Sequence, residues 1–342
     1  MEPAIHPRVQ EIERRANIWI RRSQMCATDD EYRWITATHS VNFYARFAPF
    51  ADDDRLLATA LWVYWGFAFD DARCDNGPLS SRPDQFAILA GRVQRAVEAP
   101  SASDTRERLI PPLQKIVGTF RTLGSPVQVR RFALAHRAWL SGVVWQIGNE
   151  AAGTIPDLDE YLGMRLLAAG GEPTFAMLEL ANNAEIPAGE LDSPPVRALT
   201  EMAILVAALD NDRHSAQKEA MRGHTGQNIY TVLMRHHRLS LAEALVSAAA
   251  LRDRVLDRFL QLAARVRARA SMELRTYLQG LGHGIRGNAE WGLRVPRYLS
   301  LGQVPDPLDS STSLHWAESP TDPRAAPGVT PSIAWWWDEN LA

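Results

Sequence analysis

Residues 211–219 read Asn-Asp-Arg-His-Ser-Ala-Gln-Lys-Glu, and three of their side chains carry oxygen at a helical spacing. Asn211, Ser215 and Glu219 recur every fourth residue, so an α-helix places them on one stripe. An amide oxygen, a hydroxyl and a carboxylate suit Mg²⁺ better than zinc. A polar stripe is also typical of the solvent-facing side of an ordinary helix. The apolar run 205–209 before it favours the metal site, because polar oxygens on an apolar helix need a partner.

The charge of this stripe limits what it can bind alone. Only Glu219 is formally anionic, so we expect the stripe to hold Mg²⁺ weakly unless an anionic ligand adds oxygen. A phosphate-bearing substrate would supply that oxygen.

A second acidic group ends the most apolar stretch of the chain. Residues 55–71 are apolar on every face of a helix, which predicts a helix buried on most sides. The stretch ends in Asp70-Asp71, and carboxylates at a helix C-terminus oppose the helix dipole. A bound cation would compensate for them, and so would an ion pair with Arg73.

The rest of the chain predicts an all-α fold. Alternating β-branched runs and Asn-Gly turns are nearly absent, whereas helical periodicity recurs throughout the 342 residues. The segment Leu166-Leu167-Ala168-Ala169-Gly170-Gly171 places two glycines in an apolar helical pattern, each costing roughly 1 kcal/mol against alanine. This predicts a helix break that frees backbone carbonyls or admits a close neighbour, although a simple kink or helix crossing fits equally well.

We divide the chain into a helical domain, residues 1–302, and a Pro-rich tail, residues 303–342, which we expect to be irregular or disordered. The tail ends with Trp335-Trp336-Trp337, so docking on the body or on another chain stays open, and with it a homodimer.

Composition excludes several classes of protein. A net charge of −3 gives no reason to expect nucleic-acid binding. No apolar run approaches the ~18 residues of a membrane span. Two cysteines and a start without basic or apolar leader character predict a cytoplasmic protein.

Four separated features together resemble the class I terpene synthases of the single-domain bacterial type. The family's aspartate-rich motif matches residues 70–75 in its variant with one extra spacer, and its second metal motif matches residues 211–219 completely, including Lys218. Tyr161 and Arg165 match the diphosphate-sensing region. The pair Arg297-Tyr298, preceded by Trp291, matches the C-terminal Arg-Tyr pair. The resemblance covers roughly residues 30–301.

The resemblance implies an antiparallel α-helical bundle with a deep apolar cavity that takes an isoprenyl diphosphate and three Mg²⁺ ions. It implies metal ligands on two rims, Asp70 and Asp71 in one motif and Asn211, Ser215 and Glu219 in the other, although we expect Asp71 to pair with Arg165. The residues implied to donate to the diphosphate are Arg165, Lys218, Arg297 and Tyr298.

The implied reaction is ionisation of the diphosphate followed by cyclisation of an allylic cation, whose charge aromatic faces would stabilise. Phe67 and Val63 precede Asp70 by about one and two helical turns and should face the cavity. Further cavity-lining candidates, each equally compatible with core packing, are Phe43, Trp62, Trp145, Phe175 and Trp291.

One feature departs from the family pattern at the predicted helix break. The family often carries a Thr or an acidic residue after the sensing arginine, where this chain has Ala168 and Ala169. The carbonyl that assists ionisation is therefore assigned to either Ala169 or Gly170.

Two alternatives to a cyclase remain at this stage. A chain-elongating prenyltransferase would need a second aspartate-rich motif where this chain has the Asn/Ser/Glu stripe. A non-catalytic helical protein binding an apolar ligand would not need inward-facing oxygens on two helices. Small residues around the expected cavity favour farnesyl or geranylgeranyl over geranyl diphosphate.

Overall fold

The computed structural model describes residues 1–342 except 76, 100–103, 105, 223–226, 299–318 and 342, and omits the side chains of 217, 218 and 220–222. Its described residues form helices and no strand, which confirms the all-α prediction. None of the helices in these ranges is long and apolar enough to cross a membrane. The α-helices are α1 Val9–Ser23, α2 Asp29–Thr36, α3 Ser40–Phe47, α4 Asp53–Phe69, α5 Pro83–Glu98, α6 Ile110–Leu123, α7 Pro126–Ala152, α8 Leu158–Ala168, α9 Gly171–Ala181, α10 Ala188–Leu191, α11 Pro194–Arg222, α12 Ile229–His236, α13 Leu241–Arg267, α14 Met272–Gly292 and α15 Pro331–Ala334. The π and 3₁₀ turns are η1 Asp70–Cys74, η2 Pro296–Tyr298, η3 Pro323–Ala325, η4 Trp335–Trp337 and η5 Glu339–Leu341.

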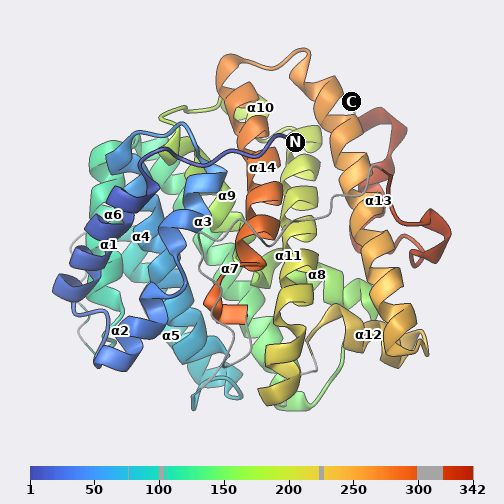
Figure 1. The fold of residues 1–342 in the computed structure, drawn as a ribbon, viewed down its shortest axis with the longest axis horizontal. Coiled ribbons are helices and arrows are strands. Elements are labelled where there is room, and N and C mark those ends of the chain that lie inside the picture. Colours follow the sequence, from blue (N-terminus) through green and yellow to red (C-terminus); the bar gives the residue numbers. More distant parts are fainter. Residues whose placement is uncertain (76, 100–103, 105, 223–226, 299–318, 342) are drawn as a thin grey trace.

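The helices enclose a central cavity. Figure 1 shows α14 between α3 and α11, and it packs against both. On the other sides, α4 packs against α3 and α9, while α7 packs against α8 and α9. α13 covers the outside of α11. Because the cavity lies within the bundle, residues far apart in the sequence meet at its mouth.

The buried helix predicted at residues 55–71 is α4, and it ends differently from the prediction. Its residues from Leu56 to Phe69 are mostly buried on all faces, as their composition requires. The chain then continues as the π-helical turn η1, in which the Asp75 N–H donates to the Asp70 carbonyl at 2.9 Å. Such turns add one residue to the helical repeat and occur often at functional sites.

The predicted helix break is present between α8 and α9. Gly170 has φ +72°, a left-handed conformation that glycine adopts without steric cost. α9 starts at the next residue and carries Pro173 in its first turn, where a missing N–H is tolerated. The break turns the chain at the wall of the cavity.

Small residues on α14 let the neighbouring helices approach it. A Cβ on Gly284 would lie 2.6 Å from the Phe175 ring and 2.8 Å from the Phe47 ring. Glycine at this position therefore makes room for two aromatic side chains at the cavity wall.

Residues 303–318 of the predicted tail lie outside the described residues, whereas residues 319–341 pack on the body, the docking that the sequence left open. This segment forms short helical turns that dock on the body, where Figure 1 shows the C-terminus beside α13. Arg258 donates to the Trp336 carbonyl at 2.7 Å, and the Trp336 indole donates to Glu201 at 2.9 Å. Trp336 and Ile333 are fully buried. Apolar burial thus fixes a segment whose prolines do not favour helix.

Candidate active site

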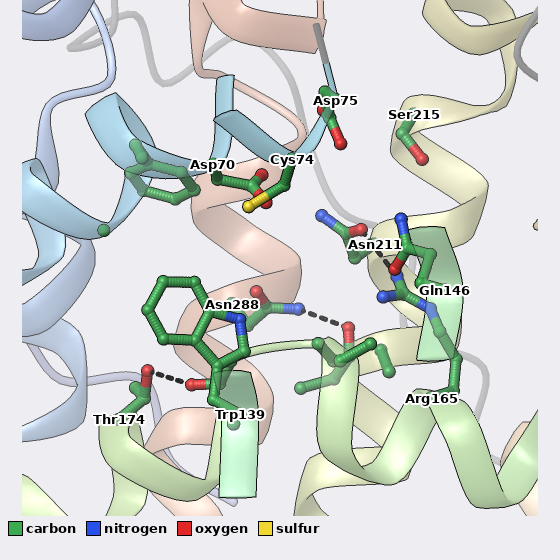
Figure 2. A pocket seen from close by; sticks show the side chains of 18 of the residues that line it. Asp70, Cys74, Asp75, Trp139, Gln146, Arg165, Thr174, Asn211, Ser215 and Asn288 are labelled. Atoms are coloured by element: carbon green, nitrogen blue, oxygen red, sulfur yellow. Dashed lines mark hydrogen bonds between the residues drawn. The ribbon is translucent and has the colours of Figure 1, made fainter. Parts of the chain in front are cut away.

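The cavity has a volume of about 430 Å³, within the usual range for small-molecule pockets. Its mouth is polar and its interior is mostly aromatic and aliphatic. Figure 2 shows Asp70, Cys74 and Asp75 on one side of the pocket, facing Asn211, Gln146 and Arg165 on the other. The two predicted rims therefore meet across one opening.

The first rim is the π-turn after α4. Asp70 and Asp75 both line the cavity, as does the buried Cys74 between them. Because the π-turn lengthens the helical repeat by one residue, Asp75 returns to the side occupied by Asp70. Asp75 was not among the predicted site residues, although the extra spacer in its motif was the available signal.

Asp71 points away from this opening, and its expected pairing with Arg165 is wrong. It does not line the main cavity but a smaller pocket behind it. Its carboxylate accepts a hydrogen bond from the Trp34 indole at 2.9 Å and forms an ion pair with Arg297. Consecutive residues of a helical turn project in different directions, and here Asp70 faces the cavity whereas Asp71 faces the smaller pocket. The structure therefore gives no support to Asp71 as a metal ligand.

The second rim is the stripe on α11, and Asn211, Ser215 and Glu219 all line the cavity. The Asn211 amide donates to the Tyr298 hydroxyl at 2.7 Å and accepts from Arg165 at 2.9 Å. Glu219 accepts a hydrogen bond from Asn228 at 2.9 Å. Burial raises the pKa of Glu219, and the nearby Asp212 adds to that effect.

Arg165 on α8 pairs with Asp212, which the sequence analysis did not assign. The guanidinium donates to one Asp212 carboxylate oxygen at 2.7 and 3.0 Å. The other oxygen accepts from the Tyr161 hydroxyl and from the Ile229 backbone N–H. Burial alone would lower the pKa of Arg165, but the Asp212 carboxylate raises it above its ordinary value. Arg165 is therefore a fixed cation at the mouth.

Arg297 and Tyr298, adjacent on η2, connect the two rims. Arg297 lies 3.5 Å from the Asp70 carboxylate and pairs with Asp71, while the Tyr298 hydroxyl meets Asn211. Burial opposes the charge of Arg297, but Asp71 raises its pKa above the ordinary value. One short turn thus contacts both motifs. The side chain of Lys218, also predicted to bind diphosphate, lies outside the described residues.

The aromatic wall contains most of the predicted side chains. Phe67 stacks on Trp291 with ring centroids 5.5 Å apart, and the Arg297 guanidinium lies 4.7 Å from the Phe67 centroid. The predicted residues that line the cavity are Val63, Phe67, Phe43, Trp62, Phe175 and Trp291. Phe47 and Trp139 also line the cavity, and neither was among the predicted residues.

The prediction that Trp145 lines the cavity is wrong. Its side chain is 40% exposed, whereas Trp139, Gln146 and Glu150 of the same helix face the cavity. These three recur at spacings of seven and four residues, the period of one helix face, and Trp145 falls outside it. Aromatic character alone did not reveal which face of α7 is inward.

The carbonyl groups at the helix break differ in their partners. The Gly170 carbonyl accepts from the Thr174 hydroxyl at 2.7 Å and from its N–H at 3.3 Å. Ala169 lies before the N-cap Gly170, whose left-handed conformation keeps the Ala169 carbonyl out of the hydrogen-bond series of α9. Both residues line the cavity. Helical bonding therefore uses the Gly170 carbonyl and leaves that of Ala169 without its ordinary donor.

The donor set at the mouth fits a hard cation bound together with an anion. Carboxylate, amide and hydroxyl oxygens from both rims line one opening. Within the described residues, no three His, Cys, Asp or Glu side chains lie together as a metal site. An ion held here would therefore depend on oxygens from its bound partner.

Comparison with known proteins agrees with this geometry. Residues 61–258 match the model of terpene synthase family 2, C-terminal metal binding. The chain is 64% identical to spiroviolene synthase of Streptomyces violens, covering 100% of this chain and 95% of that protein. It is 35% identical to phomopsene synthase of Allokutzneria albata, covering 97% and 93%. A crystal structure of a protein from ancestral sequence reconstruction has 62% identity and a TM-score of 0.89, covering 100% and 98%.

Proposed function

The chain belongs to the terpene synthase family, and from that premise we propose that it cleaves the carbon–oxygen bond of a linear isoprenyl diphosphate and cyclises the resulting cation. The product would be a terpene hydrocarbon or alcohol, and the enzyme a lyase. The observation that supports this best is a mouth of basic groups and oxygen donors above an aromatic cavity.

The basic groups at the mouth would hold the diphosphate head. Arg165, Arg297 and Tyr298 line the opening from α8 and η2 and can form charge-assisted hydrogen bonds to phosphate oxygens. Asp212 and Asp71 keep the two guanidinium groups charged and oriented. Lys218, in the 211–219 motif, is proposed as a further hydrogen-bond donor to the diphosphate. These contacts would strengthen as negative charge develops on the leaving diphosphate.

Metal ligation is proposed for Asp70 and Asp75 on one rim and for Asn211, Ser215 and Glu219 on the other. Their oxygens suit Mg²⁺, and three ions are the number that the family resemblance implies. Bound there with the substrate, Mg²⁺ would supply neutralising charge to the diphosphate.

The cavity walls would shape and stabilise the hydrocarbon chain once the diphosphate leaves. Phe67, Trp291 and Phe43 form one aromatic cluster beside Asp70, with neighbouring ring centroids 4.9 to 6.3 Å apart. Each aromatic face can stabilise a nearby cation by up to about 2 kcal/mol in a dry site. The buried walls would also exclude water until the cyclic skeleton has formed.

Ala169 is the better candidate for the carbonyl that assists ionisation. Its oxygen lies outside the hydrogen bonding of α9, whereas the Gly170 carbonyl already accepts from Thr174. An acceptor without its usual donor can direct its full dipole at positive charge on the substrate.

Neither alternative function is favoured. The second rim carries the Asn/Ser/Glu stripe, whereas chain elongation would need a second aspartate-rich motif. A metal-free binding protein would not need oxygen donors on both rims. The cavity volume and the small residues Gly66 and Ala208 in its wall favour farnesyl or geranylgeranyl diphosphate over the shorter geranyl diphosphate. The homodimer and the cytoplasmic location stay predictions from the sequence.

The function is tested by diphosphate release and gas chromatography with the geranyl, farnesyl and geranylgeranyl substrates. We expect Mg²⁺-dependent release that EDTA abolishes, together with a cyclic terpene from one of the two longer substrates. Asp70→Ala and Asn211→Ala should each reduce release by about a hundredfold or more, because several kcal/mol of charge stabilisation are lost.

The matched control is Asp84→Ala, which removes an exposed carboxylate on α5. Its rate should equal that of the wild type, and all three variants should retain the helical circular dichroism of the wild type. Near-normal release by folded Asp70→Ala and Asn211→Ala proteins would defeat the proposed function.

A further inference from the structure

Asn288 on α14 is a polar residue in a part of the cavity that the diphosphate machinery does not explain. It is 8% exposed and lines the cavity beside apolar and aromatic side chains. The other amides and acids that line the cavity lie around its mouth, among them Gln146 and Asn211 (Figure 2). A buried amide in apolar surroundings needs a partner for each of its polar ends.

One hydrogen bond fixes the orientation of this amide. The Asn288 nitrogen donates to the Ala207 carbonyl on α11 at 3.0 Å. A reversed amide would bring two acceptor oxygens together, so the nitrogen must face Ala207 and the oxygen must face elsewhere. Figure 2 shows that oxygen pointing away from the Ala207 bond. The carbonyl dipole of Asn288 is thereby held in one direction before any ligand binds.

The position of Asn288 along the cavity follows from its neighbours. Ala207 precedes Asn211 by four residues of α11, a rise of about 6 Å. Asn288 therefore lies about one helical turn below the proposed metal ligand, and Trp291 follows it within a turn of α14. This is the level at which the hydrocarbon chain of a diphosphate held at the mouth would begin.

We propose that the Asn288 side-chain oxygen contacts the cationic hydrocarbon and helps to determine which product forms. The proposal rests on the proposed function. A preorganised dipole stabilises charge strongly where water is excluded, and it needs no reorganisation during the reaction. A carbocation whose positive charge lies near this oxygen would be more stable than one whose charge lies elsewhere in the apolar cavity. Cyclisation routes through such carbocations would therefore be faster than the loss of a proton from an early, acyclic or monocyclic cation.

Asn288→Leu tests the proposal, because leucine has nearly the same shape but no oxygen. We expect the ratio of the main product to acyclic and monocyclic products to fall by about tenfold, which corresponds to about 1.4 kcal/mol between competing barriers. Diphosphate release should stay within a few-fold of the wild type, since Asn288 lies below the groups that bind the head.

Tyr277→Phe is the matched structural control. It removes another side-chain hydrogen bond between the same two helices, from the Tyr277 hydroxyl on α14 to Thr200 on α11 at 2.9 Å, and neither residue lines the cavity. We expect its product blend to equal that of the wild type. Should the leucine variant not fold, Asn288→Ala, which also lacks the oxygen, takes its place.

The outcomes separate this proposal from the proposed function. An unchanged blend in the folded leucine or alanine variant would overturn the role of Asn288 alone. Equal changes in the Asn288→Leu and Tyr277→Phe blends would overturn it as well, because they would show a packing effect. A wild-type protein that forms no terpene from any of the three substrates would overturn both proposals.

Discussion

Asp212 does not line the cavity, but its ion pair orients Arg165, which does. It occupies the second position of the 211–219 motif but is buried, with its carboxylate turned towards α8 and α12. Sequence spacing places it off the Asn211 stripe, so it carried no signal for metal binding. Its partners, Arg165 and Tyr161, show that it positions the cation at the mouth.

Removing the charge of Asp212 should destabilise the protein. Asp212→Asn leaves the Arg165 guanidinium buried without its counter-charge, and breaking such a buried pair costs about 3 kcal/mol or more. We expect this loss in the free energy of unfolding measured in urea. The control is Asp210→Asn, whose pair with Arg252 is more exposed, with both side chains at 14%. Equal losses in the two variants would contradict the assigned role.

The helix break is the feature that matters most at the scale of elements. Gly170, in the left-handed conformation, separates α8 from α9, so the Ala169 carbonyl lies outside the hydrogen bonding of α9. The sequence predicted the break, but its two candidate carbonyls became distinguishable only through the Thr174 hydrogen bonds to Gly170.

Weakening the left-handed turn at Gly170 should slow ionisation. Gly170→Ala places a Cβ where φ is +72°, which costs roughly 1–2 kcal/mol, so it disfavours the break that exposes the Ala169 carbonyl. We expect kcat for diphosphate release to fall by about fivefold while the helical content is unchanged. Gly153→Ala, at the left-handed end of α7 and away from the cavity, should leave kcat unaltered. The role of the break would be refuted by a normal rate in a correctly folded Gly170→Ala protein.

At the scale of the whole molecule, the C-terminal segment is packed on the helical body. Residues 319–341 contact α8, α11 and α13 through Asp159, Glu201 and Arg258. α8 carries Arg165 and α11 carries the metal motif, so the segment packs against the outer sides of two helices that form the site. The helical body and this segment therefore act as one packed unit.

Undocking the segment should destabilise the fold. Trp336→Ala removes a fully buried indole and its bond to Glu201, and such changes typically cost about 3–5 kcal/mol. We expect a lower thermal midpoint by calorimetry. Trp337→Ala, which changes a partly buried side chain next to it, should lower the midpoint less. Identical midpoints for wild type and Trp336→Ala would show that the docked segment contributes nothing to stability.

The sequence alone determined what depends on local spacing. A repeat of four residues places Asn211, Ser215 and Glu219 on one stripe wherever that helix packs, and an all-apolar stretch must be buried. The all-α class, the helix break and the oxygen-bearing stripe at 211–219 follow from such rules, because each involves residues within a few turns of one another. That Asp70 and this stripe form two rims of one site was implied by the family resemblance.

Only the tertiary structure decided which of those residues face each other. Asp71 lies against Arg297 rather than Arg165, Trp145 is exposed while Trp139 lines the cavity, and residues 319–341 are packed against the body. Each outcome depends on contacts between segments far apart in the chain, and the helical period alone does not reveal which side of a helix its neighbours will cover. The orientation of Asn288 is decided in the same way, by a carbonyl on another helix.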